Sequence, residues 1–276
     1  MPQDTLVQSL EPVDVLIVGA GVSGISAAYY LSERCPDKSY AIIEARDAMG
    51  GTWDLFRYPG IRSDSDLYTF GFSFRPWTAD TAFASGAQIK AYIEDTAREF
   101  GIDQHIHFGR KALSAAWDSA AAQWTVTIDH GGNTETIVCR MLYMCPGYYD
   151  YAAGYRPEWD GESEFTGQII HPQDWPEDLN YTGKNIVVIG SGATAVTLLP
   201  SLAETAGHVT MLQRSPSYIT EMPARDNLAI KARKMFGAKA AHGLIRWKNI
   251  IRTIFFYNLA RKFPNFVKNG LKKAAT

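Results

Sequence analysis

Asp14 to Glu44 read DVLIVGAGVSGISAAYYLSERCPDKSYAIIE, and this stretch decides the fold of the first half of the chain. It contains a short apolar strand, a Gly-x-Gly-x-x-Gly turn at 19–24, a segment with helical spacing, and a second strand at 40–43. Glu44 follows about 20 residues after the last glycine. This order of strand, glycine turn, helix, strand and acid predicts a β-α-β unit that binds a dinucleotide.

Each residue type in this pattern has a physical role. Gly19 permits a tight turn, Gly21 lets main-chain N–H groups approach a pyrophosphate, and Gly24 lets helix and strand pack closely. The helix dipole favours the phosphate charge. Glu44 can accept hydrogen bonds from a ribose. A glycine turn alone is a weak signal, but its place between two strands makes this one specific.

The same pattern occurs a second time at residues 185–212. Its glycine turn consists of Gly190, Ser191, Gly192, Ala193, Thr194 and Ala195. The second strand ends in Gln213 and Arg214 rather than in an acid. A guanidinium pairs with a ribose 2′-phosphate, which an acid would repel. The first unit is therefore predicted to take an unphosphorylated ribose and the second NADPH, unless Arg214 is only a solvated surface residue.

A long loop rich in glycine, proline, charge and aromatic residues joins the first unit to the middle of the chain, at about 45–66. Long loops are usually functional or disordered, and the aromatic residues argue against disorder. The loop either is stapled by its own aromatic rings or wraps a flat aromatic cofactor, and the neighbouring dinucleotide pattern favours the cofactor. Residues 113–117, 123–128 and 135–143 then alternate as three strands of a β-meander.

Composition excludes several classes of protein. The formal net charge of -2 indicates no class of partner by itself. No apolar run approaches the roughly 18 residues that span a bilayer. The first 13 residues carry acids and no bases, unlike a secretory signal. Cys35, Cys139 and Cys145 are odd in number and form no Cys-x-x-Cys pair, which argues against a disulfide framework or a zinc site and fits a reducing cytoplasm. Cys139 and Cys145 also lack the Cys-x-x-x-x-Cys spacing of a disulfide reductase. No metal site is predicted.

The last part of the chain is basic and helical in pattern. No acid follows Asp226, while the bases after it are Lys231, Arg233, Lys234, Lys239, Arg246, Lys248, Arg252, Arg261, Lys262, Lys268, Lys272 and Lys273. Its apolar residues either pack on a partner domain or face anionic membrane lipids. Nucleic-acid binding is the weakest interpretation, because no base-reading module accompanies the charge.

A motif between the two units carries a resemblance to a known family. The letters FTGQIIHPQDWPE at 165–177 match FxGxxxHxxxWP, the fingerprint of the type I Baeyer–Villiger monooxygenases, with Glu177 where aspartate is commoner. The loop at 50–66 is most similar to that of the ethionamide-activating monooxygenase group. Flavin monooxygenases that oxidise amines and sulfides usually lack the Trp-Pro ending. The resemblance extends from about Asp14 to Asn269.

The resemblance implies a reaction with FAD and NADPH as cofactors. NADPH reduces FAD, oxygen adds at the flavin C4a, and the resulting peroxide anion attacks a ketone to give an ester or lactone. The same oxidant can oxygenate sulfur, so the substrate is a small ketone or sulfide together with O2. The flavin supplies the chemistry while the protein positions it. The alternatives are a flavin monooxygenase that hydroxylates nitrogen or sulfur, and an inactive nucleotide-binding remnant.

The resemblance also assigns residues. Asp64 is expected near the flavin, where it orients the family's active-site arginine, and His171 belongs to the linker that responds to NADPH; both are candidates for catalytic roles. Pattern and resemblance together give cofactor contacts at Gly19, Gly21, Ser23, Gly24, Glu44, Gly51, Thr52, Trp53, Asp54, Leu55, Arg62, Ser63, Asp64 and Ala112, besides the second turn with Gln213 and Arg214.

The predicted fold is α/β with two Rossmann-like units, one for FAD with an inserted β-meander and one for NADPH. We expect an incomplete FAD domain at 1–150, a linker with the fingerprint at 151–184, and a partial NADPH domain at 185–276 that includes a basic helical segment at 226–276. Members of the family are much longer and return to complete the FAD domain. The resemblance therefore implies an N-terminal fragment, with the active-site arginine beyond Thr276.

Overall fold

The structure is a computed structural model that describes residues 8–215, 219 and 223–274. Two compact units divide it. The first joins the residues up to Arg57 with Ala87–Asp174, and the second joins Tyr58–Gly86 with the residues from Trp175 onward. The chain therefore passes between the units after Arg57, Gly86 and Asp174. The predicted parts 1–150, 151–184 and 185–276 divide the chain at other places and remain predictions.

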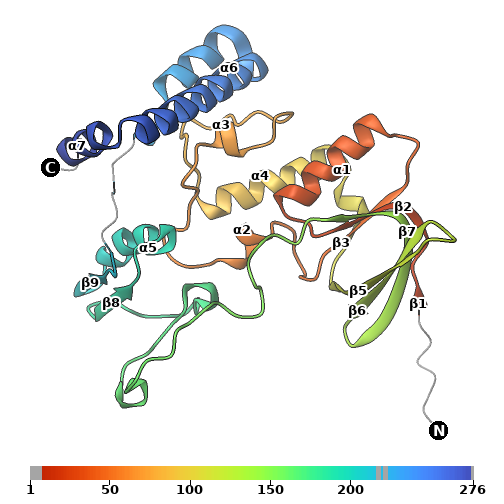
Figure 1. The fold of residues 1–276 in the computed structure, drawn as a ribbon, viewed down its shortest axis with the longest axis horizontal. Coiled ribbons are helices and arrows are strands. Elements are labelled where there is room, and N and C mark those ends of the chain that lie inside the picture. Colours follow the sequence, from red (N-terminus) through yellow and green to blue (C-terminus); the bar gives the residue numbers. More distant parts are fainter. Residues whose placement is uncertain (1–7, 216–218, 220–222, 275–276) are drawn as a thin grey trace. The chain divides into compact units, whose positions relative to one another are not determined.

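The first unit is a mixed sheet with helices, shown in Figure 1. Its elements are β1 (Gln8–Ser9), β2 (Val13–Val18), α1 (Val22–Arg34), β3 (Tyr40–Ile43), α2 (Thr52–Leu55), α4 (Gly86–Glu99, which begins at the unit boundary), β4 (Ile106–His107), β5 (Arg110–Asp118), β6 (Gln123–His130) and β7 (Asn133–Met144), with short 3₁₀ turns at Asp103–His105, Glu162–Glu164 and Pro172–Asp174. α1 and α4 lie side by side in Figure 1. The ring of Tyr29 on α1 packs edge-on against that of Phe100, which directly follows α4, with the ring centroids 4.7 Å apart.

The strand order β4-β3-β2-β7-β6-β5 places β2 in the middle of the sheet. β2 pairs in parallel with both β3 and β7, so that Val18 lies beside Ile43 on one side and Met144 on the other. β5, β6 and β7 are antiparallel and form the predicted meander. The strand–helix–strand unit carries its glycine turn at the carboxyl ends of β2 and β3, where α/β folds bind ligands.

The core of this unit lies on both faces of β2, because a central strand buries alternate side chains on opposite sides. Ile17 faces α1, since a Cβ added to Gly24 would lie 3.6 Å from its Cγ2. Leu16 faces the other way and packs with the buried side chains of the meander, among them Ile128 and Ile137. The apolar run at residues 15–18 is therefore a buried strand, as its length predicts.

The second unit, Tyr58–Gly86 with the residues from Trp175 onward, contains a shorter β-α-β motif and four helices among its described residues. Its elements are α3 (Leu67–Phe70), β8 (Asn185–Ile189), α5 (Ala193–Ala203), β9 (His208–Leu212), α6 (Asn227–Lys262) and α7 (Pro264–Ala274). β8 and β9 pair in parallel, as the repeated pattern predicts. α6 is broken at Gly237, whose φ of 76° and ψ of 169° interrupt the helix.

Polar contacts with α6 explain why Tyr58–Gly86 belongs to the second unit. Asp66 caps α3 through the Thr69 N–H at 3.0 Å and also accepts a hydrogen bond from Asn249 Nδ2 at 2.9 Å. Arg246 donates to the carbonyls of Tyr68 and Gly71 at 2.8 and 2.9 Å. Part of the basic charge in α6 is therefore used to hold a loop and is not presented to a partner.

Gly60 is a position where the backbone and the packing both require glycine. Its φ is +78°, and an added Cβ would lie 2.3 Å from Ser201 Oγ and 2.8 Å from the Thr197 carbonyl oxygen of α5. We expect Gly60→Ala to lower the free energy of unfolding by about 2–4 kcal/mol, the sum of left-handed strain and overpacking.

Gly183→Ala is the matched control, since Gly183 has a φ of +70° but, within the part of the chain that the structure describes, no atom within 4 Å of an added Cβ. Its expected cost is the strain alone, about 1–2 kcal/mol. Urea unfolding of both variants measures the difference. Equal losses would mean that the tight approach of Gly60 to α5 does not exist in solution.

Candidate cofactor-binding sites

The first glycine turn has the geometry that the pattern predicts. Gly19 has a φ of +105°, and a Cβ on Gly24 would lie 1.9 Å from the Gly19 carbonyl oxygen, so neither position accepts a side chain without a shift. Gly21 is the N-cap of α1 and, among the described residues, no side chain caps this helix start. The first N–H groups of α1 thus stay available to an anion.

Glu44, the predicted ribose ligand, lies beside this turn. The residue is 7% exposed, and Oε2 accepts a hydrogen bond from the Ala20 N–H at 2.8 Å. Oε1 accepts a second one from the Arg46 N–H at 3.0 Å. Two main-chain donors therefore hold the carboxylate in a fixed direction at the ends of β2 and β3. Ser23, in the first turn of α1, is exposed.

The loop at residues 50–55 packs directly on the first turn. The Gly50 N–H donates to the Ala20 carbonyl at 3.1 Å. Gly51 has a φ of +55°, and a Cβ there would lie 3.2 Å from the Gly21 Cα. Two glycine-rich segments thus meet without side chains between them, followed by half-buried Thr52, Trp53 and Leu55 in α2. This cradle, together with the uncapped α1, fits a dinucleotide such as FAD.

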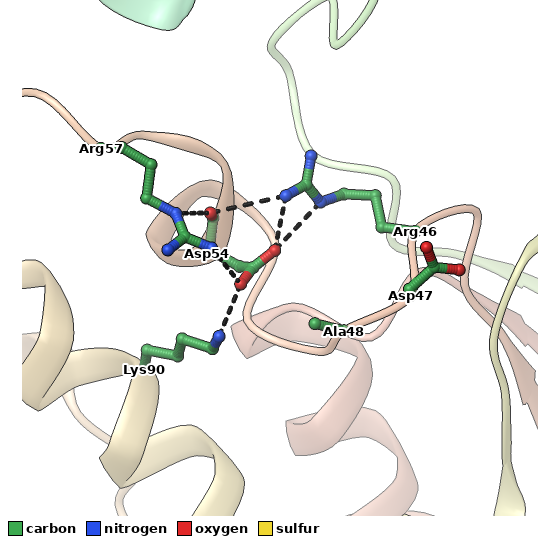
Figure 2. A pocket seen from close by; sticks show the side chains of 6 residues that line it. All are labelled: Arg46, Asp47, Ala48, Asp54, Arg57 and Lys90. Carbon is green, nitrogen blue, oxygen red and sulfur yellow. Dashed lines mark hydrogen bonds and ion pairs between the residues drawn. The ribbon is translucent and has the colours of Figure 1, made fainter. Parts of the chain in front are cut away.

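Asp54, also in α2, is surrounded by basic side chains, as Figure 2 shows. The residue is 2% exposed, and three cations surround its carboxylate. Arg46 Nη2 lies at 2.5 Å, Lys90 Nζ at 2.6 Å and Arg57 Nη2 at 3.2 Å. The Asp54 carbonyl also accepts from Arg57 Nε at 2.8 Å, and its N–H donates to Gly51. The polar atoms of Asp54 are therefore used by the loop and by Lys90 of α4, which indicates a structural role, and the predicted cofactor contact of Asp54 stays a prediction.

The cluster in Figure 2 lines an open pocket together with Asp47 and Ala48. Burial alone would raise the pKa of the Asp54 carboxyl, but the hydrogen bonds and charges of Lys90 and Arg46 outweigh it and hold this pKa below the ordinary value of 3.8. The carboxylate thus stays charged at neutral pH and joins the loop after β3 to α4. The sequence gives no sign of this cluster, because its members are up to 44 residues apart.

Arg62, Ser63 and Asp64 belong to the second unit, so the predicted FAD set is divided between the two units. Ser63 is buried, with its N–H on the Ala84 carbonyl at 2.9 Å and its hydroxyl on the Ser65 carbonyl at 2.7 Å. Arg62 pairs its backbone with Ser85. Arg62 and Asp64 themselves are exposed, so the loop is fixed while these two side chains are available to other groups.

Ala112 lies on β5, half-buried against the core of the meander and paired with Ile128. Its predicted cofactor contact stays a prediction.

His171 is held by the linker of the first unit. Its Nδ1 accepts a hydrogen bond from the Gln173 N–H at 3.2 Å, and a Cβ on Gly154 would lie 2.0 Å from its Cε1. Gln173 in turn donates from its amide to the Asp150 carbonyl at 2.7 Å. Trp175 belongs to the second unit, where its ring lies 6.2 Å from that of Tyr181. The boundary between the units thus falls inside the fingerprint motif.

The second glycine turn repeats the first with more open surroundings. Gly190 has a φ of +130°, and no atom of the described residues lies within 4 Å of a Cβ added to it or to Gly192. Gly192 is the N-cap of α5, again without a side-chain cap among the described residues, and Ala195 is buried. Arg214 follows β9 and is exposed. The turn and the guanidinium fit a phosphorylated dinucleotide.

Comparison with known proteins identifies the family. The flavin-binding monooxygenase-like family matches residues 13–230, which is most of the chain. The chain belongs to this family. It is 56% identical over 255 residues to the FAD-containing monooxygenase EthA of Mycobacterium tuberculosis, a match that covers 92% of this chain and 52% of EthA. The predicted resemblance to the ethionamide-activating group is thereby confirmed.

Solved structures of similar proteins support the same fold. A cyclohexanone-bound cyclohexanone monooxygenase matches with a TM-score of 0.73 and 29% identity, over 88% of this chain and 45% of that protein. An NADP-bound steroid monooxygenase matches with a TM-score of 0.71 and 31% identity, over 85% and 44%. The predicted α/β fold is confirmed, and the chain spans about half the length of the relatives that it matches.

Proposed function

We propose that this chain provides the FAD- and NADPH-binding parts of a Baeyer–Villiger monooxygenase, which inserts one oxygen atom of O2 into a small ketone and also oxidises sulfides. The observation that carries the proposal is the pair of uncapped glycine turns with different residues at the ribose position. A fixed Glu44 lies at the first turn and an exposed Arg214 follows the second. Family membership and the fingerprint at 165–177 support it.

The residues of the chain would divide the work as follows. The turn at 19–24 and the start of α1 bind the FAD pyrophosphate, and Glu44 binds its ribose. The turn at 190–195 binds the NADPH pyrophosphate, and Arg214 pairs with the 2′-phosphate. Asp64 orients an arginine supplied by the remainder of the protein. When bound, the flavin reduced by NADPH supplies the activation of oxygen.

The test uses a full-length protein in which the chain is continued by the remaining half of EthA. With NADPH and oxygen, we expect an ester or lactone from a simple ketone such as cyclohexanone. The chain without this continuation is the control, and it should form no ester because the expected active-site arginine is absent. Oxygenation of an amine or a sulfide without any ester from ketones would favour the nitrogen- and sulfur-hydroxylating class instead.

The location of the protein and its contact with lipid belong to the same proposal. Among the described residues no helix is both long and apolar enough to span a bilayer. The three free cysteines fit a reducing cytoplasm. Trp247, Arg252 and Phe255 are exposed on α6, which suits either a further domain or an anionic lipid surface.

Sedimentation of the full-length protein with vesicles decides between these two partners. Binding to phosphatidylserine but not to phosphatidylcholine vesicles would support a lipid surface. No binding to either would assign the apolar side chains of α6 to protein packing.

A further inference from the structure

Tyr58 connects the loop that carries Asp64 to the second glycine turn. The residue is 8% exposed, and its hydroxyl is hydrogen-bonded to the side chain of Thr194. Thr194 lies in the first turn of α5 and belongs to the segment that the repeated pattern assigns to a dinucleotide pyrophosphate. No motif in the sequence links these two residues, which are far apart along the chain.

One face of α5 contacts the loop at Tyr58 and at Gly60. Thr194, Thr197 and Ser201 are spaced by three and four residues and so lie on one side of the helix. The Thr194 side chain is hydrogen-bonded to the Tyr58 hydroxyl. A Cβ added to Gly60 would lie 2.8 Å from the Thr197 carbonyl oxygen and 2.3 Å from Ser201 Oγ. The loop is thus seated on the helix at two successive points.

The far end of the loop is equally fixed. The Ile61 carbonyl accepts from the Gly86 N–H at 2.9 Å, and the Ser63 N–H donates to the Ala84 carbonyl at 2.9 Å. Asp64 follows directly and is exposed. Between Tyr58 and Asp64 the segment is thus held at Gly60, Ile61 and Ser63, and we expect a shift at Thr194 to move it as one piece.

The chemistry of the Tyr58–Thr194 pair determines which hydroxyl protons are available to a phosphate. Burial raises the pKa of the Tyr58 hydroxyl, the bond to Thr194 lowers it and the charge of Asp64 raises it, with a net increase. The hydroxyl is protonated at neutral pH, so either hydroxyl of the Tyr58–Thr194 pair can donate to the other. When a phosphate oxygen is present, Tyr58 can donate to Thr194 Oγ1, and the proton of Thr194 is then left to donate to the phosphate. Hydrogen bonds in such a chain strengthen one another.

We propose that Tyr58 is a positioning residue of the NADPH site, which orients the Thr194 hydroxyl toward the pyrophosphate and transmits nucleotide binding to the loop that bears Asp64. The inference rests on the proposed function, because it requires a dinucleotide at the turn of residues 190–195. It adds a physical connection, inside one unit, between that turn and a residue expected to act beside the flavin.

The test measures NADP⁺ affinity and amide exchange in the chain itself. Calorimetric titration should show that Tyr58→Phe and Thr194→Val each weaken NADP⁺, the first by about two- to tenfold, as for one neutral hydrogen bond. The double variant should bind no more weakly than Thr194→Val alone, because the two residues act through one contact. Tyr68→Phe, a buried tyrosine of α3 in the same unit, is the control and should bind as the wild type does.

Hydrogen–deuterium exchange supplies a readout that does not need activity. Without nucleotide, the amides of residues 60–64 should exchange faster in Tyr58→Phe and Thr194→Val than in the wild type or in Tyr68→Phe. NADP⁺ should slow this exchange in the wild type and not in Tyr58→Phe. Circular dichroism melting shows whether each variant is folded.

Two failures can be told apart. A wild-type chain that binds NADP⁺ with the same affinity as Tyr58→Phe, or variants whose losses simply add, would overturn this inference and leave the proposed function intact. A wild-type chain that binds no NADP⁺ at all would contradict the assignment of the second turn, and the inference would fall with it.

Discussion

Arg214→Gln is expected to weaken NADPH binding about tenfold to a hundredfold and to leave NADH binding almost unchanged. The exposed guanidinium follows β9, at the end of the strand where the ribose 2′ substituent is recognised. The substitution removes a charge-assisted contact, worth roughly 1.5–3 kcal/mol, to a phosphate that NADH lacks. Calorimetric or fluorescence titration of both nucleotides with the chain gives the two ratios.

Arg261→Gln controls for the loss of one positive charge, since Arg261 is an exposed base of the same unit on α6. It should change both affinities little. The comparison between nucleotides cancels general destabilisation, because NADPH and NADH share every other contact. Equal losses for the two nucleotides in Arg214→Gln would show that Arg214 is a solvated surface residue.

The second large effect is expected on stability. Asp54→Asn should lower the free energy of unfolding by about 3 kcal/mol, because removal of one partner from a buried ion-pair network leaves the others uncompensated. Here three cations lose the same counter-charge. Asp47→Asn, at an exposed acid lining the same pocket, should cost far less. Urea unfolding at pH 7 measures both losses.

The pH dependence gives this prediction its sign. The folded-state pKa of Asp54 lies below the ordinary 3.8, so its contribution is fully present above about 3.8 and is lost as the pH falls through the folded pKa. The stability gap between wild type and Asp54→Asn should therefore be constant from pH 7 to about 5 and should close at lower pH. A gap that persists unchanged in acid would show that the amide disturbs packing rather than charge.

Local patterns were sufficient to predict the two β-α-β motifs with their glycine turns. A glycine turn between two short apolar strands dictates its own fold, because the roles of Gly19, Gly24 and Glu44 are set within some thirty residues of chain. The structure places all three as the pattern requires. The meander was predictable for the same reason, since alternation at a period of two is a local property.

Contacts between distant residues could not be predicted in this way. Asn249 and Asp66 are 183 residues apart and meet only because α6 packs on α3. Nothing in the run of bases distinguishes Arg246, which holds two carbonyls of the loop, from bases that stay exposed. Asp54 was assigned to a cofactor from its place in a motif, whereas its three cationic neighbours are assembled only by the tertiary fold.

Isotope labelling of the product tests the central claim most directly. The full-length protein, continued with the remaining half of EthA, is supplied with NADPH, a ketone and ¹⁸O₂ in unlabelled water, and the ester is analysed by mass spectrometry. The account predicts an ester that contains one ¹⁸O atom, in the newly formed C–O bond. An ester without ¹⁸O, or consumption of NADPH with no ester at all, would contradict the proposal that this chain belongs to a Baeyer–Villiger monooxygenase.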